Sequence, residues 1–228
     1  MPDLLDAIEI ETGAAPTVSI IWMHGLGADG HDFVDIVPAL RLPARPGVRF
    51  VFPHAPMRPV TINGGYVMRA WYDIREVRGE RREDADGVRA SQKAIEALIQ
   101  RETERGVPAA AIVLAGFSQG GAMALHTSLR HAERLAGVMA LSCSLPLADT
   151  LAAEAAPANR DVPIFMAHGT QDPMIPLARA LRAREVLTGL GYRVEWHEYP
   201  MPHSVCPQEI ADIAAWLGRV LGVASVTR

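Results

Sequence analysis

The sequence predicts an α/β fold with a mainly parallel central sheet and helices on both faces. Its strand candidates are continuous, β-branched apolar runs, which is typical of strands that are buried on both sides. Longer amphipathic segments separate several of these runs, and such an alternation favours parallel strands joined by crossover helices. The hydrophobic fraction of 49% and the charged fraction of 21% are ordinary for a globular protein of this class.

A series of apolar runs, each bounded by turn residues, marks the expected strands. In chain order they are Val18–Met23, Arg49–Phe52, Ala111–Ala115, Leu135–Leu141, Val162–Ala167 and Arg193–Tyr199. Strands of this kind, separated by helices, indicate a mainly parallel sheet that is covered on both faces.

Helical periodicity fills much of the sequence between these runs. The expected helices are Asp84–Arg105, an alanine-rich pattern over Ala122–Leu129, Leu177–Gly189 and Gln208–Leu221. In the first of them apolar residues recur every three or four positions, and Gly106 follows where a helix commonly ends.

Three other stretches lack such a pattern. Pro53–Arg82 is rich in Pro and Gly, and a loop this long is usually functional or partly ordered by short strands. At its end, the interleaved charges of Arg78–Arg82 are interpreted as a solvated loop that leads into a helix. Leu151–Ala158 is rich in alanine and is interpreted as a surface stretch.

Length and composition exclude several classes of protein. A chain of 228 residues is expected to form a single domain over residues 1–228. The net charge of −4 and a pI near 6.1 oppose a nucleic-acid or anionic-membrane surface. Two cysteines, Cys143 and Cys206, cannot form a disulfide scaffold, and without a C-x-x-C pair structural zinc is not expected. We see neither a signal-peptide pattern nor an apolar run of membrane-spanning length, so a cytoplasmic protein is expected.

The most informative motif is Gly116-Phe117-Ser118-Gln119-Gly120. It follows an apolar strand candidate and opens a helical pattern, which is the context of a nucleophile elbow. In that turn the residues two before and two after the serine must be small, so that strand and helix can approach. The turn would present the Ser118 hydroxyl at the edge of the sheet and aim the next backbone N–H at the same reacting atom.

A serine needs a base, and the base needs a carboxylate that orients it. Asp172 follows the strand candidate Val162–Ala167, and His203 follows Arg193–Tyr199. The order Ser, acid, His, with each residue on a loop after a later strand, is that of α/β-hydrolase triads. The alternative for Asp172 is a loop residue that caps the helix after Pro176.

The other histidines have weaker claims to catalysis. His168 precedes Asp172 on the same short loop and is interpreted as a structural turn residue. His24 lies at a strand end and His197 inside a strand pattern, where a core or surface role is the better interpretation. The histidines for which the sequence suggests no partner are His31, His54, His126 and His131.

Acyl transfer also needs two preplaced N–H donors for the oxyanion. Gln119 supplies one because it follows the nucleophile, and the second is expected from the glycine-rich loop His24–Gly30 after the first strand. This loop also matches G-x-G-x-x-G, the pattern of a dinucleotide-binding loop. That match is weak by itself, and the acidic residue expected about 20 positions on is missing.

Together these motifs resemble the carboxylesterase and acyl-protein-thioesterase (lysophospholipase-like) group of α/β-hydrolases. The motifs that carry the resemblance occur in the order His24–Gly30, Pro53–Pro56 with Arg58–Thr61, Trp71–Asp73, Gly116–Gly121, Gly169–Asp172 and Pro202–His203. The resemblance extends over essentially the whole chain.

The resemblance implies an α/β-hydrolase fold without a large lid domain. It implies a Ser118–Asp172–His203 triad and an oxyanion hole made by the backbone amides of Leu26 and Gln119. It also implies that Pro53–Asp73 lies beside an acyl pocket. Leu26, Trp71 and Leu145 would line the apolar wall of that pocket, although Trp71 could equally be a core aromatic.

One position departs from the family pattern. Ser144 stands where members often carry an aromatic residue, so the width of the pocket and its preference for chain length stay open. Cys143 is expected to be a small buried hydrophobe. Cys206 lies three residues after His203, and no specific feature supports a redox role for it.

The expected activity is that of a serine carboxylesterase acting on short-to-medium-chain, uncharged esters through an acyl-enzyme, with no metal or organic cofactor. The alternative is an acyl-protein thioesterase or lysophospholipase acting on long chains, which an exposed apolar groove near Met57–Met68 would favour and a short closed pocket would oppose. A different class is a silent hydrolase-fold protein that binds a hydrophobic ligand. A small-molecule ester is the expected partner, nucleic acid is not, and pairing of two chains stays open.

Overall fold

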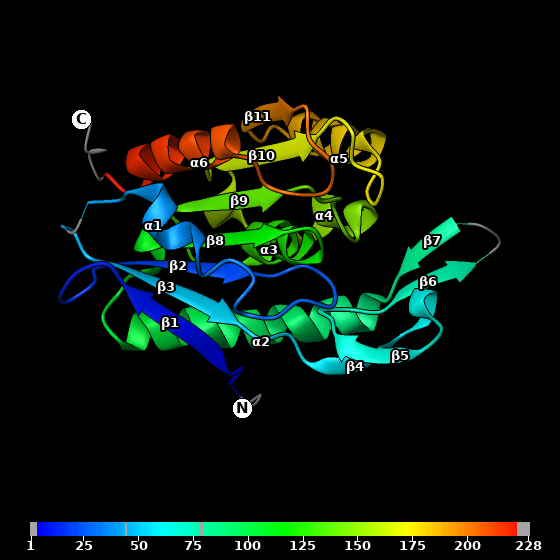
Figure 1. Ribbon diagram of the computed structural model, residues 1–228, viewed down its shortest axis with the longest axis horizontal. Coiled ribbons are helices and arrows are strands. Elements are labelled where there is room, and N and C mark those ends of the chain that lie inside the picture. The colour runs from blue at the N-terminus through cyan, green and yellow to red at the C-terminus, as the bar shows by residue number, and fades with distance from the viewer. Residues whose placement is uncertain (1–3, 44, 78–79, 223–228) are drawn as a thin grey trace.

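The fold is organised around one large sheet, seen in the computed structural model, which describes residues 4–43, 45–77 and 80–222. Its seven strands lie in the order β1-β3-β2-β8-β9-β10-β11 (Figure 1). They are β1 (Ala7–Glu11), β3 (Val48–Pro53), β2 (Val18–Met23), β8 (Ile112–Phe117), β9 (Gly137–Leu141), β10 (Ile164–Gly169) and β11 (Val194–Tyr199). Only the β1–β3 pair is antiparallel among these neighbours. The α/β-hydrolase fold is therefore confirmed.

Helices cover both faces of this sheet. One face carries α1 (Ile36–Leu40) and α6 (Pro207–Val220); the other carries α2 (Ala85–Glu104), α3 (Gln119–Arg130), α4 (Ala148–Glu154) and α5 (Leu177–Gly189) (Figure 1). In the described part of the chain no separate helical lid covers the sheet. None of the described helices is both long and apolar enough to cross a membrane.

The continuous apolar runs are explained by two hydrophobic cores, one on each face of the sheet. Along β2, Ile20 and Trp22 join the core under α1 and α6, whereas Ile21 and Met23 join the core under α2 and α3. Successive side chains of a strand point to opposite faces, so a strand covered on both sides has few polar positions. All six predicted strands are present, with ends within a few residues of those observed. Five of them lie inside the sheet, and the sixth, Arg193–Tyr199, is the partly exposed edge strand β11.

Two further hairpins order the long Pro- and Gly-rich region. β4 (Met57–Val60) pairs with β5 (Tyr66–Arg69), and β6 (Ile74–Val77) pairs with β7 (Glu80–Glu83). A short 3₁₀ helix at Thr61–Asn63 joins β4 to β5. Both hairpins project from the same end of the sheet (Figure 1), so the alternative of short strands was the right one for this region.

Several local interpretations need correction. The stretch Glu80–Arg82 is strand β7 rather than loop or helix start, while Arg78 and Gly79 lie outside the described residues. The alanine-rich stretch begins inside helix α4, whose Leu151 is fully buried in the core. The rest of the stretch, residues 152–158, is exposed or partly exposed, so the expected surface position holds except at Leu151. Cys143 is buried as expected, and burial raises the pKa of its thiol to about 12.

Glu209 in the first turn of α6 is a buried carboxyl group with a measurable consequence. Burial raises its pKa to about 8; Asp212 adds to the effect and the Cys206 backbone partly opposes it. The folded chain therefore holds this proton more tightly than the unfolded chain does. The stability from the protonated group is full below the ordinary pKa of 4.5 and is lost as the pH rises through about 8.

An amide at this position cannot ionise, so it should remove the loss of stability that accompanies ionisation of the buried Glu209 carboxyl at high pH. We expect Glu209→Gln to raise the free energy of unfolding by roughly 1–3 kcal/mol at a pH of about 8.5 and to change it little at a pH of about 4.5. Urea unfolding followed by circular dichroism at both pH values measures the difference. An equal effect at the two pH values would contradict a cost linked to the Glu209 proton.

Candidate active site

Ser118 occupies a sharp turn between β8 and α3. Its φ of 55° and ψ of −120° lie in a region that non-glycine residues rarely adopt. A Cβ on Gly116 would collide with the backbone of Gly120, and a Cβ on Gly120 would collide with the backbone of Met23. The two glycines are therefore required by the close approach of helix and strand, and the elbow predicted from the sequence is present.

Asp172 lies on the loop that follows β10, and it is almost completely buried, with 8% of its surface exposed. Its Oδ1 accepts hydrogen bonds from the backbone amides of Met174, at 2.8 Å, and Ile175, at 2.9 Å. The second oxygen, Oδ2, lies 2.6 Å from Nδ1 of His203. The loop thus fixes one oxygen and directs the other at the imidazole, which is an orienting role and not a cap on α5.

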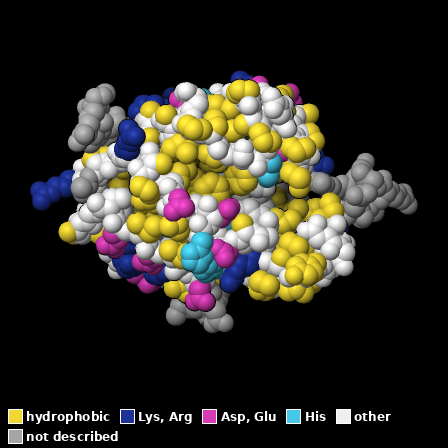
Figure 2. Space-filling view, viewed as in Figure 1, with side chains coloured by type: hydrophobic (Ala, Val, Ile, Leu, Met, Phe, Trp, Pro, Cys, Tyr) yellow, Lys and Arg dark blue, Asp and Glu magenta, His cyan; other side chains and the backbone are white. Residues whose placement is uncertain are grey.

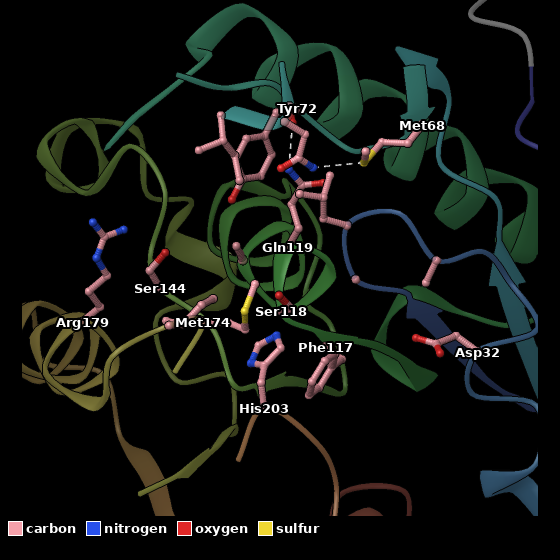
Figure 3. A pocket seen from close by; sticks show the side chains of 17 residues that line it. Asp32, Met68, Tyr72, Phe117, Ser118, Gln119, Ser144, Met174, Arg179 and His203 are labelled. Atoms are coloured by element: carbon pink, nitrogen blue, oxygen red, sulfur yellow. Dashed lines mark hydrogen bonds between the residues drawn. The ribbon is translucent and has the colours of Figure 1, made fainter. Parts of the chain in front are cut away.

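His203 follows β11 and reaches the same edge of the sheet. Its ring packs against Phe117, with 4.7 Å between ring centroids, and both Ser118 and His203 line one pocket. Figure 3 shows the serine hydroxyl and the imidazole facing one another across the floor of this pocket. Because Nδ1 is engaged by Asp172, Nε2 is the ring nitrogen that remains available on the side of the pocket.

His168 is a site residue that sequence reasoning did not assign to the site. It lies inside β10 and not on the following loop, and it is fully buried. Its Nε2 is 2.8 Å from the carbonyl oxygen of Ile175 and 3.5 Å from Oδ2 of Asp172. His168 therefore contacts the turn that holds Asp172 at two points, the carbonyl of Ile175 and the carboxylate of Asp172. The spacing of four residues between His168 and Asp172, after an apolar strand, is the signal that could have indicated it.

Among the described residues, hydrogen bonds hold the loop between β2 and α1 in place but leave the amide of Leu26 without a partner. Gly27 donates its N–H to the carbonyl of Arg69 at 2.9 Å, and Gly30 donates to Nδ1 of His54 at 3.1 Å. Among the described residues, no hydrogen bond engages the amides of Leu26 or Gln119. Both residues line the pocket beside Ser118. This arrangement can supply two N–H donors to an oxyanion.

The same loop does not fit a dinucleotide site. Such a site needs a glycine loop that opens directly into a helix, whereas α1 has five residues and begins only at Ile36. His24 instead fastens the loop from within. Its Nε2 accepts the Ala55 amide at 3.0 Å, while Nδ1 lies 2.6 Å from the Gly25 carbonyl. Acceptance at Nε2 requires a neutral ring, and burial lowers the pKa of His24 accordingly.

Gln119 links the elbow to the segment before β6. Its side-chain Oε1 accepts the amide of Trp71 at 2.8 Å, and its Nε2 donates to the carbonyl of Tyr72 at 2.7 Å. The Gln119 side chain is thus a positioning group, in addition to the amide that the sequence analysis identified. The wall of the pocket formed by Tyr72 is held in place by this pair of bonds (Figure 3).

Two residues expected in the pocket wall lie behind it. Trp71 is fully buried, and its indole Nε1 donates to the carbonyl of His24 at 2.9 Å. Leu145 is 8% exposed and belongs to the same core. Neither is among the residues that line the pocket, whereas Leu26 and Ser144 are. The expectation for Trp71 and Leu145 is corrected: the core interpretation of Trp71 is the one that fits.

The pocket around Ser118 is mostly apolar and has a volume of about 330 Å³. Its apolar wall includes Leu26, Met68, Tyr72, Ile74, Phe117 and Met174. At its edge, Met174 is 57% exposed. On the adjoining β4–β5 hairpin, the large apolar side chains Met57, Tyr66 and Val67 are 59%, 70% and 52% exposed. Figure 2 shows hydrophobic side chains gathered over this hairpin at the lower right.

No group of three or more His, Cys, Asp or Glu side chains in the described ranges is arranged to hold a metal ion. Two of the histidines without a predicted partner have one in the structure: His31 contacts Asp29, and His126 contacts Gln92. These contacts lie outside the pocket that contains Ser118.

Comparisons with known proteins find relatives that match most of the chain. Residues 6–221 match the family described as phospholipase/carboxylesterase. An acyl-protein thioesterase 1 of Gibberella zeae is 41% identical over 214 residues, which cover 90% of this chain and 91% of that protein. Among solved structures, Arabidopsis thaliana SOBER1 superposes with a TM-score of 0.83 at 30% identity, covering 90% of this chain and 99% of that one. Zea mays acyl-protein thioesterase 2 has a TM-score of 0.84 at 26% identity, covering 95% and 99%.

Proposed function

The chain belongs to the phospholipase/carboxylesterase family and is a serine hydrolase by that membership; on this premise we propose that it is a thioesterase and esterase that removes medium-to-long acyl chains. The observation that carries the proposal is the apolar pocket around Ser118, which opens beside the exposed apolar residues of the β4–β5 hairpin. Relatives named acyl-protein thioesterases support the long-chain alternative over the short-chain carboxylesterase.

In the proposed reaction Ser118 attacks the carbonyl carbon of the ester or thioester. Nε2 of His203 takes the hydroxyl proton, and Asp172 stabilises the imidazolium through the contact at Nδ1. The carbonyl oxygen becomes an oxyanion, which the amides of Leu26 and Gln119 receive. When the tetrahedral intermediate collapses, the bond to the leaving group breaks, and His203 returns the proton to the departing alcohol or thiol.

The acyl-enzyme is then hydrolysed by the same groups. Water attacks the acyl carbon while His203 takes its proton, and Ser118 leaves as the protonated hydroxyl with the free carboxylic acid as product. Every group in both halves of the reaction comes from the chain itself. The apolar wall contributes by burying the acyl chain, because each buried methylene is worth about 0.8 kcal/mol.

Chain length is therefore the discriminating variable. We expect kcat/KM for p-nitrophenyl esters to rise from butyrate to octanoate by on the order of 10²-fold, since four methylenes are buried at about 0.8 kcal/mol each and part of this is lost to chain ordering. A palmitoyl thioester of a short peptide should also be cleaved. Both reactions can be followed by absorbance, with a thiol reagent for the second.

An optimum at acetate or butyrate, together with an inert palmitoyl thioester, would overturn the long-chain proposal. It would return the activity to that of a short-chain carboxylesterase acting with the same triad. Absence of hydrolysis on every substrate would instead favour a ligand-binding protein that retains the hydrolase fold.

A further inference from the structure

Among the described residues that line the pocket there is one arginine and no lysine: Arg179, in the first turn of α5. In Figure 3 it lies on the side of Ser144 and Met174, away from Ser118, while Asp32 lies on the opposite side of the pocket. The acyl-transfer steps proposed above use neither residue. Both residues nevertheless line the pocket, and both are exposed to solvent.

The guanidinium of Arg179 has no carboxylate partner among the side chains that the structure describes. One turn along the same helix, Arg182 does have one, because its Nη1 lies 3.2 Å from Oε2 of Glu185. A free guanidinium at a pocket wall offers paired N–H donors to a carboxylate, and this is the geometry for which arginine is best suited.

The neighbours of Arg179 define the shape of the matching ligand. Met174 and Ile175 line the wall between the Ser118 side and α5, and Figure 3 shows Met174 on the path from Ser118 towards Arg179. A ligand that reaches both ends must therefore place an apolar segment beside these two residues and an anionic group beyond them. Asp32 on the far side would repel the same anion in the reverse orientation.

We propose that Arg179 is a specificity-determining residue that selects esters or thioesters whose apolar chain ends in a carboxylate. This inference rests on the proposed function and adds a charge preference to it. The carboxylate can belong to the acyl chain or to the leaving group, and the chemistry of recognition is the same. The apolar residues Met174 and Ile175 favour a carboxylate at the end of the acyl chain, because an acyl chain can extend past them towards Arg179. The leaving group, by contrast, must remain close to His203, which returns a proton to it.

The test compares matched charged and neutral substrates. For the acyl side, the p-nitrophenyl monoester of suberic acid is compared with p-nitrophenyl octanoate. For the leaving group, the octanoyl ester of 4-hydroxybenzoate is compared with that of 4-methylphenol. We expect Arg179→Gln to lower kcat/KM for the suberate monoester by about tenfold, mainly through KM, as for the loss of one charge-assisted contact. The neutral octanoate should change by less than about twofold.

Arg182→Gln is the matched control, because it removes the same charge from the same helix outside the pocket. It should leave the ratio of charged to neutral rates unchanged. A tenfold loss confined to the hydroxybenzoate ester would place the carboxylate on the leaving group. An unchanged ratio in Arg179→Gln for both pairs, or an equal change in Arg182→Gln, would overturn the proposal. If the wild type cleaves no substrate, the proposed function fails, and so does the proposed preference among substrates. Calorimetry of suberate binding to the wild type and to Arg179→Gln then tests separately whether Arg179 recognises a carboxylate.

Discussion

Ser118→Ala is expected to lower kcat/KM for p-nitrophenyl octanoate by at least ~10³-fold, because it removes the only atom proposed to form the acyl-enzyme. Folding should survive the change. Alanine is smaller than serine, and no hydrogen bond of the Ser118 hydroxyl to another described residue is lost. Relief from the φ of 55° is not expected, since alanine has the same Cβ.

A covalent label separates this role from a general loss of structure. A fluorophosphonate should add one phosphonyl group to the wild type and none to Ser118→Ala, while the two proteins keep the same melting temperature. Ser144→Ala is a useful comparison, because Ser144 lines the same pocket. It should be labelled normally and retain activity within about tenfold. Undiminished hydrolysis by Ser118→Ala would exclude the acyl-enzyme mechanism.

The fold, and the meeting of Ser118, Asp172 and His203 at one edge of the sheet, could be predicted because their signals are local. Each of the three residues lies within a few positions of the end of a parallel strand, and parallel strands bring such ends to one edge of the sheet. The elbow adds a steric requirement: positions 116 and 120 have no room for a Cβ, so each must be glycine. These features are encoded within a few residues of each position, so a single sequence carries them.

Other features depend on contacts between distant segments. Trp71 could be a pocket residue or a core residue until its indole is seen to donate to the His24 carbonyl, 47 positions away in sequence. In the same way, the Gln119 side chain forms hydrogen bonds with backbone groups of Trp71 and Tyr72, which are distant from it in sequence. Arg179 has no special pattern in a helix that contains several arginines, and only its place in the wall distinguishes it.

The edge strand β1 was not predicted, for a different reason. In β1 the residues Ile8 and Ile10 alternate with Glu9 and Glu11, which is the pattern of a strand with one exposed face. The search for continuous apolar runs passed over it. The alternation is the signal that could have identified this antiparallel edge strand.

Asp172→Asn is expected to lower kcat by about 10³- to 10⁴-fold with little effect on stability. The amide oxygen can still accept the N–H groups of Met174 and Ile175, so the loop keeps its hydrogen bonds. The amide nitrogen would then face Nδ1 of His203, where the carboxylate oxygen now lies at 2.6 Å. A donor at that position forces the imidazole proton onto Nε2, and Nε2 can no longer take the proton of Ser118.

Asp172→Ala and Asp161→Asn complete this experiment by separating chemistry from structure. Asp172→Ala leaves the same two amides unpaired next to the buried His168, so it should lose activity and also about 1–3 kcal/mol of unfolding free energy. Asp161→Asn changes an exposed carboxylate outside the pocket and should alter neither quantity. Rates and urea unfolding measured on all three variants decide the matter. If Asp172→Asn loses as much stability as Asp172→Ala, the carboxylate acts chiefly as a structural group. Asp172→Asn could instead keep its stability and lose its rate. Hydrogen bonding within the loop is the same in the wild type and in Asp172→Asn, so that result would show that the negative charge itself prepares His203 to act as the base.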